Sequence, residues 1–99
     1  MKKCNQCQQK IFKNSIKSKG FTIYIRPWCL YSQNALKMLN NIGAPYTCYN
    51  LDHPTCKHLE ESLRVQLKPK RLTVPQVFFN GKYIGGHDDL QKYLRKGTF

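Results

Sequence analysis

Acidic residues are scarce in this chain of 99 residues, because five Asp and Glu stand against 17 Lys and Arg, which gives a formal net charge of +12. Long apolar stretches are absent as well, and no run approaches the roughly 20 apolar residues that a membrane helix needs. The basic start leads into polar residues rather than into the apolar core of a signal peptide. These absences predict a soluble, unsecreted protein that makes no membrane contact and favours acidic partners.

The sequence also lacks internal repeats and any recognised base-reading motif. The basic residues are scattered along the chain, so the charge alone does not indicate nucleic acid, and we do not expect nucleic-acid binding as the main role. An apolar content of 40% with six Tyr and five Phe is enough to close one core. Length and composition together therefore predict one domain.

The five cysteines are an odd number, and their spacings do not indicate a closed framework of disulfide bridges. We therefore expect a reducing, cytoplasmic compartment. Cys4 and Cys7 have the spacing of half a zinc site or of a redox pair, but a single such pair is a weak signal, and a plain polar segment is the simpler interpretation. The alternatives are a local disulfide or attack by either thiol on Cys29 bearing glutathione. They belong to residues 1–20, a polar stretch that we separate as a leader from a domain over residues 21–99.

Hydrophobic periodicity and turn residues divide the domain into strands and helices. We expect strands at 21–25, 46–51, 76–79 and 82–84, and helices from about 29 to 42, from 54 or 55 to about 67, and from about 88 onward. A helix separates the first two strands, which are therefore predicted to be parallel. Asn80-Gly81 predicts an antiparallel hairpin between the last two strands. The predicted fold class is α/β, with a mixed four-stranded sheet flanked by helices.

Cys29 lies at the end of the first strand and at the start of a helix, where unpaired N–H groups and the helix dipole favour an anion. This setting and the charge of Arg26 are expected to lower the pKa of the thiol from about 8.5 toward roughly 3.5 to 7.5. A sulfur of low pKa is a good leaving group from a mixed disulfide. Ser32 stands where many redox proteins have a second cysteine, which predicts a one-cysteine cycle. The simpler alternative is a small buried cysteine.

Three segments resemble the glutaredoxin family of the thioredoxin-like superfamily: 25–32 (Ile-Arg-Pro-Trp-Cys-Leu-Tyr-Ser), 73–75 (Thr-Val-Pro) and 85–90 (Gly-Gly-His-Asp-Asp-Leu). With the elements between them, the resemblance covers about residues 21 to 94. It implies a thioredoxin-like fold and an enzyme that reduces glutathione mixed disulfides by a monothiol mechanism. Glutathione is then the co-substrate, and glutathionylated proteins are the partners.

The resemblance also implies the residues of the site. Cys29 is the catalytic residue, and Arg26, Pro27, Tyr31 and Ser32 support it. A cis Val74-Pro75 bond would present the Val74 backbone beside Cys29, free to pair with glutathione as an added strand. The helix start beyond Gly86, for which Asp88 or Asp89 is the expected N-cap, would hold the γ-glutamyl end. The implied glutathione-binding residues are Arg26, Tyr31, Thr73, Val74, Pro75, Gly86, His87, Asp88 and Asp89.

Departures from the family pattern leave a second function open. The segment 29–32 (Cys-Leu-Tyr-Ser) has neither the second cysteine of dithiol members nor the Gly-Phe pair of the common monothiol class. Relatives without proline after the catalytic cysteine can bridge a [2Fe-2S] cluster between two subunits with two glutathiones, and Leu30 occupies that position here. The alternative function is therefore a cluster carrier or scaffold with Cys29 as the metal ligand. We expect a monomer, or a dimer if a cluster is bound.

Overall fold

The computed structural model describes residues 20–68 and 72–97. The elements are β1 (Phe21–Ile25), α2 (Leu30–Asn41), β2 (Tyr46–Asn50), the 3₁₀ helix η1 (Pro54–Cys56), α3 (Lys57–Leu67), β3 (Gln76–Phe79), β4 (Lys82–Gly85) and α4 (His87–Lys96). Their order is the predicted one, with η1 added ahead of α3. The expected leader lies outside the described residues except for Gly20.

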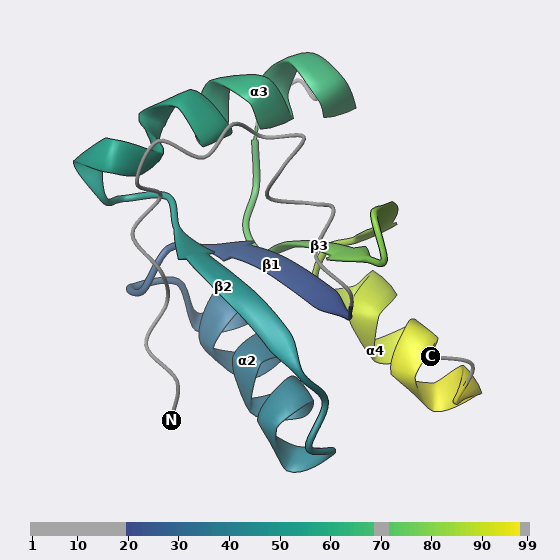
Figure 1. Ribbon diagram of the computed structural model, residues 1–99. Helices are drawn as coiled ribbons and strands as arrows, with labels where there is room; N and C mark the ends of the chain where they lie inside the picture. The colour runs from purple at the N-terminus through teal and green to yellow at the C-terminus, as the bar shows by residue number, and fades with distance from the viewer. Residues whose placement is uncertain (1–19, 69–71, 98–99) are drawn as a thin grey trace.

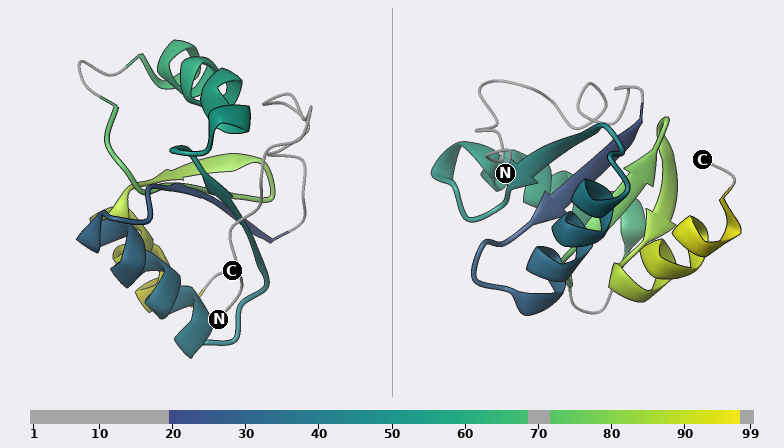
Figure 2. Two further views of the ribbon diagram at one scale, coloured as in Figure 1. Left: turned by 90° about the vertical axis from the view of Figure 1, so that its left-hand side faces the viewer. Right: turned by 90° about the horizontal axis from the view of Figure 1, so that it is seen from below.

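The four strands form one mixed sheet in the order β2-β1-β3-β4. β1 is parallel to β2, as predicted, and it pairs antiparallel with β3 on its other side. The β3–β4 hairpin turns at Asn80 and Gly81, whose φ angles are 50° and 84°, the positive values that this dipeptide favours. α3 covers one face of the sheet, and α2 and α4 lie side by side on the other (Figures 1 and 2).

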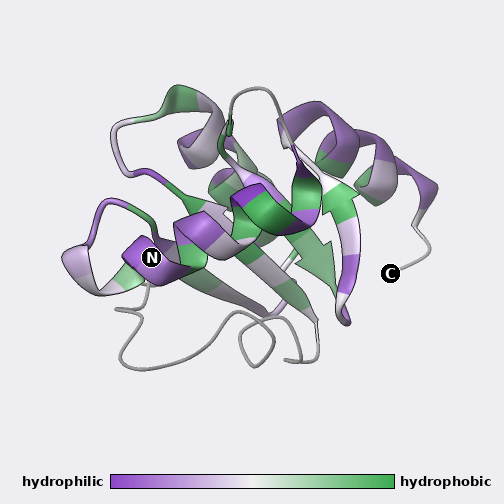
Figure 3. Ribbon diagram, turned by 90° about the horizontal axis from the view of Figure 1, so that it is seen from above, coloured by the Kyte–Doolittle hydropathy of each residue, from purple (hydrophilic) through white to green (hydrophobic). Residues whose placement is uncertain are grey.

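Alternate residues of the strands enter two cores, because successive side chains of a strand point to opposite faces. The core toward α3 contains Tyr24, Tyr49, Leu59, Leu63 and Phe78, among others. Leu67 packs against it, so α3 directs leucines at four-residue spacing toward the sheet. The core toward α2 and α4 contains Phe21, Ile23, Ala35, Leu39 and Leu90, among others. In Figure 3 apolar and polar residues are interspersed along the strands, and much of the helix surface is polar.

Two helix ends differ from the prediction. The helix expected to about residue 42 ends at Asn41, and the apolar Ile42 at its expected last position is the C-cap and is 48% exposed. α4 begins at His87 with Gly86 as its N-cap, so neither predicted aspartate is the cap. Asp89 instead accepts a hydrogen bond from the Gly86 N–H at 3.4 Å, so it caps the helix from within the first turn.

Within the described ranges, no helix combines the length and the apolar character needed to cross a membrane.

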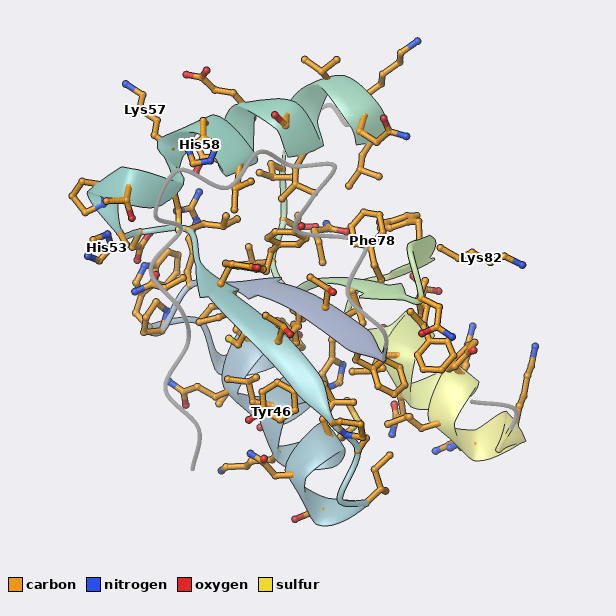
Figure 4. All side chains as sticks on the ribbon, viewed as in Figure 1. Tyr46, His53, Lys57, His58, Phe78 and Lys82 are labelled. Carbon is orange, nitrogen blue, oxygen red and sulfur yellow. The ribbon has the colours of Figure 1, made fainter. Side chains whose placement is uncertain are left out.

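The β3–β4 hairpin is hydrogen-bonded to the residue before β1. The Gly20 N–H donates to Asn80 Oδ1 at 2.7 Å, and the Asn80 N–H donates to the Gly20 carbonyl at 3.0 Å. Lys82, at the start of β4, points away from this junction toward solvent (Figure 4). The site residues lie at the opposite ends of β1 and β3.

Candidate functional site

Cys29 is the N-cap of α2, with extended backbone angles of φ −84° and ψ 122°. Its carbonyl accepts a hydrogen bond from the Gln33 N–H at 3.0 Å, and its own N–H donates to the Arg26 carbonyl at 3.0 Å. This turn connects the end of β1 to the start of α2 and places Cys29 at the N-terminal end of the helix. Its side chain is half-buried, and the thiol is free. The predicted place of Cys29, between strand and helix, is confirmed.

The loop before β3 lies against this thiol. The Val74-Pro75 bond is cis, as the resemblance implied. Cys29 Sγ lies 3.7 Å from the carbonyl oxygen of Val74, which is within range of a weak S–H hydrogen bond. A segment that follows Cys29 by 45 positions therefore forms one wall of the site.

Two side chains that the sequence analysis did not single out hold this loop. Gln76 Nε2 donates to the Thr73 carbonyl at 2.8 Å, and the Tyr83 hydroxyl donates to Gln76 Oε1 at 2.6 Å. Burial raises the pKa of Tyr83, and the negative charge of Asp89 raises that pKa further. The position of the cis-proline loop thus depends on a hydrogen-bonded chain that runs from the edge strand β4 through Gln76.

The start of α4 lies next to the cis-proline loop. A Cβ atom placed on Gly86 would lie 3.5 Å from the Pro75 carbonyl oxygen, so this N-cap is in contact distance of the cis-proline loop. The rings of His87 and Tyr31 lie 5.3 Å apart between centroids, which connects the starts of α4 and α2. Asp88 is exposed and pairs with His87 Nδ1 at 2.8 Å. The N-terminus of α4, which carries the positive end of the helix dipole, therefore lies against the cis-proline loop and the start of α2.

Arg26 lies on the other side of the turn, where carboxylates hold it. Its Nη1 donates to Asp52 Oδ1 at 2.6 Å, and its Nη2 pairs with Glu60 of α3. Burial alone would lower the pKa of Arg26, but the hydrogen bonds to Glu60 and Asp52 outweigh it and raise that pKa above its usual value. The positive charge of Arg26, which was expected to act on the Cys29 thiol, is thus paired with the carboxylates of Asp52 and Glu60.

Ser32 and Pro27, which were also predicted to support Cys29, make hydrogen bonds that stabilise the turn before it. Ser32 is fully buried, and its Oγ accepts a hydrogen bond from the Arg26 N–H at 3.4 Å. The Pro27 carbonyl accepts a hydrogen bond from Gln33 Nε2 at 2.8 Å. The first turn of α2 is thereby bonded to Arg26 and Pro27, two of the three residues between β1 and Cys29.

Asp52 was also missed, although the predicted topology contained a signal for it. β1 and β2 are parallel and end together, with Ile25 opposite Asn50. Residues that follow paired parallel strands meet at one edge of the sheet, so a carboxylate two positions beyond β2 is a natural partner for a cation just beyond β1. His53, the next residue, lies where β2 passes into η1 (Figure 4).

Two other cysteines of the domain are disulfide-bonded, contrary to the prediction from their spacing. Cys48 on β2 and Cys56 on η1 are buried and disulfide-bonded. The expectation that the cysteines form no bridges is wrong for these two, and the inference from cysteine spacing to a reducing compartment loses its support. Cys4 and Cys7 lie outside the described residues. Over residues 20–68 and 72–97, no group of three His, Cys, Asp or Glu side chains is placed to hold a metal ion.

Comparison with known proteins gives consistent matches. Residues 21–84 match the family model described as Glutaredoxin. The chain is 31% identical over 90 residues to Glutaredoxin-2 of Schizosaccharomyces pombe, covering 87% of this chain and 77% of that protein. It is also 31% identical over 85 residues to Monothiol glutaredoxin-S10 of Oryza sativa, covering 86% of this chain and 52% of that protein. The solved structure of a buckwheat glutaredoxin-glutathione complex superposes with a TM-score of 0.75 at 26% identity, covering 86% of this chain and 76% of that one, so the fold is thioredoxin-like.

Proposed function

The chain belongs to the glutaredoxin family of thiol-disulfide oxidoreductases, and we propose that it uses glutathione to reduce glutathione mixed disulfides with Cys29 as its single catalytic cysteine. One observation carries the proposal: Cys29 is a free, half-exposed thiol at the N-cap of α2, with its Sγ 3.7 Å from the Val74 carbonyl. The thiol is therefore placed beside a backbone edge on which a short peptide can bind.

The proposed reaction has two exchange steps. The Cys29 thiolate attacks the glutathione sulfur of a mixed disulfide, so that a Cys29-glutathione disulfide forms, the original disulfide breaks and the substrate leaves as a thiolate that takes up a proton. A second glutathione thiolate then attacks the glutathione sulfur held on Cys29. Oxidised glutathione forms, and the Cys29 thiolate is regenerated. The substrate sulfur is reduced, and two glutathione molecules are joined as a disulfide.

The environment of Ser32 supports a one-cysteine cycle. Its hydroxyl is fully buried and occupied by the Arg26 N–H, and it offers no second thiol that could displace the glutathione from Cys29. In the proposed cycle a free glutathione therefore completes the second step. The similarity to a monothiol glutaredoxin of Oryza sativa is consistent with this cycle.

Three surfaces that meet at Cys29 suit the parts of glutathione. We place the cysteine of the tripeptide along Val74, where backbone groups can pair with it as with an added strand. Its γ-glutamyl carboxylate fits the N–H groups that open α4 beyond Gly86. The exposed carboxylate of Asp88 suits its ammonium group. Tyr31 and His87 stand between the two helix starts and would border the same groove.

The test is turnover of a glutathionylated peptide in the presence of glutathione, with oxidised glutathione as the measured product. Cys29→Ser should abolish turnover. Ser32→Ala, which removes a hydroxyl but no thiol, should retain the one-cysteine cycle if the variant is folded by circular dichroism. Undiminished turnover in Cys29→Ser would refute the proposal.

A second candidate is a glutathione-ligated [2Fe-2S] carrier, favoured by the exposed apolar residues around Cys29. Trp28 and Leu30, on either side of it, are 71% and 65% exposed, a surface on which a second chain could pack. Clusters of this type take four sulfur ligands, whereas the described part of the chain offers one free thiol, so a second copy and two glutathiones would have to complete the set. Anaerobic reconstitution with iron, sulfide and glutathione should then give a coloured dimer, and a colourless monomer would exclude this function.

A further inference from the structure

Asp52 bonds to two residues of the turn that leads into Cys29. Its Oδ1 accepts from Arg26 Nη1 at 2.6 Å, three positions before the cysteine, and its Oδ2 accepts from Trp28 Nε1 at 2.6 Å, one position before it. Hydrogen bonds to a charged acceptor are stronger than those between neutral groups. One carboxylate thus spans the segment that leads from β1 to the thiol.

Asp52 is itself held firmly. Its N–H donates to Asn50 Oδ1 at 2.9 Å, and the Leu51 N–H before it donates to the Ile25 carbonyl at 2.8 Å, which extends the β1–β2 pairing by one residue. Leu51 is buried in the core toward α3. The hydrogen bonds of Asp52 therefore hold the turn before Cys29 in a fixed position relative to the ends of β1 and β2.

Trp28 depends on this bond more than its neighbours do. The indole is 71% exposed, so little packing fixes it, whereas Arg26 has a second carboxylate partner in Glu60. Loss of Asp52 would leave Arg26 paired with Glu60 and release Trp28. A mobile indole beside Cys29 would sweep the space through which a mixed disulfide must approach the sulfur.

We propose that Asp52 is a positioning residue that fixes Trp28 beside Cys29 and thereby keeps the approach to the thiol open and ordered. The inference rests on the proposed glutathione-dependent reaction and adds a residue that acts on it through Trp28. Asp52 does not touch the reacting sulfur, so its effect should appear in the efficiency of the reaction and in the motion of the indole together.

The sequence contains one tryptophan, so its fluorescence reports on Trp28 alone. Asp52→Ala should lower the steady-state fluorescence anisotropy of Trp28 and reduce kcat/KM for a glutathionylated peptide about tenfold, because small misplacements of reacting groups are costly. The matched control is Glu60→Gln, which weakens the other ion pair of Arg26 and leaves the bond from Trp28 intact. It should keep the anisotropy and stay within about twofold of the wild-type kcat/KM.

Unchanged anisotropy and kcat/KM in Asp52→Ala would overturn the proposal, and so would equal losses in both variants, because the Arg26 ion pairs would then explain the effect. If Asp52→Ala does not fold, Trp28→Phe removes the same hydrogen bond while keeping an aromatic ring. It should show a similar fall in kcat/KM, and wild-type efficiency there would also overturn the proposal. Failure of the glutathione reaction itself would show separately, as absence of turnover in the wild-type protein.

Discussion

Replacing Gly85 by alanine tests how the glycine pair before α4 shapes the site. Gly85 has φ 134°, and a Cβ atom there would lie 2.6 Å from the Asp89 Cβ and 2.7 Å from its Cγ, far inside normal contact. Gly97, at the end of α4, also has a positive φ, 62°, but a Cβ there would meet no described atom within 4 Å. Gly97→Ala therefore measures the backbone cost alone, and Gly85→Ala measures that cost plus the clash.

The magnitudes follow from these two contributions. A left-handed backbone costs a non-glycine residue about 1–2 kcal/mol, which is the expected loss of unfolding free energy in Gly97→Ala. In Gly85→Ala, Asp89 must also move away and give up its bond to the Gly86 N–H, and the loss of such a cap costs about 0.5–2 kcal/mol. The expected loss in Gly85→Ala is therefore about 1.5–4 kcal/mol.

Urea unfolding followed by far-ultraviolet circular dichroism measures both losses, and turnover of a glutathionylated peptide measures the effect on the site. KM should rise in Gly85→Ala because the start of α4 moves, and it should stay near the wild-type value in Gly97→Ala. Equal losses of stability in the two variants, or an unchanged KM in Gly85→Ala, would refute the role assigned to this close approach.

Two further predictions concern stability. The pKa of Tyr83 is raised by burial and by a nearby carboxylate, so the folded state holds this proton more tightly than the unfolded chain does, whose tyrosine pKa is about 10. The contribution of Tyr83 to the unfolding free energy should be complete below about pH 10 and should be lost as the pH rises through the folded pKa. The unfolding free energy, measured in urea at several pH values, should therefore fall less steeply in Tyr83→Phe than in the wild type. Identical pH dependence in the two proteins would contradict this prediction. Leu63, fully buried on α3, should lose about 2–5 kcal/mol as Leu63→Ala. Val65, 74% exposed on the same helix, should lose less than about 0.5 kcal/mol as Val65→Ala, and similar losses in both would contradict the predicted core face.

Local patterns predicted most of the fold because each element agrees with its tertiary surroundings. The apolar run at 21–25 became a strand buried on both faces, and Asn80-Gly81 formed the turn that its backbone freedom favours. The boundary errors arose where side chains compete for helix ends. Asp89 caps α4 from its third position, which moves the helix start to His87, an arrangement that the residue types alone do not distinguish from capping by the aspartate itself.

The site was predictable where a motif carried it and not where distant residues supply the contacts. The place of Cys29 between strand and helix followed from the residue pattern, and the cis Val74-Pro75 bond followed from the family resemblance. Asp52 and the Tyr83 to Gln76 bond depend on which strands end together and which side chains share a face, so they emerge only once the sheet order is known. The assignment of individual residues to parts of glutathione stays a prediction.

The most direct test of the central claim is peptide mapping by mass spectrometry after brief exposure of the reduced protein to oxidised glutathione. The account predicts one glutathione on Cys29, removed again when fresh reduced glutathione is added. Absence of glutathione from Cys29, or a Cys29 adduct that persists in excess reduced glutathione, would contradict it.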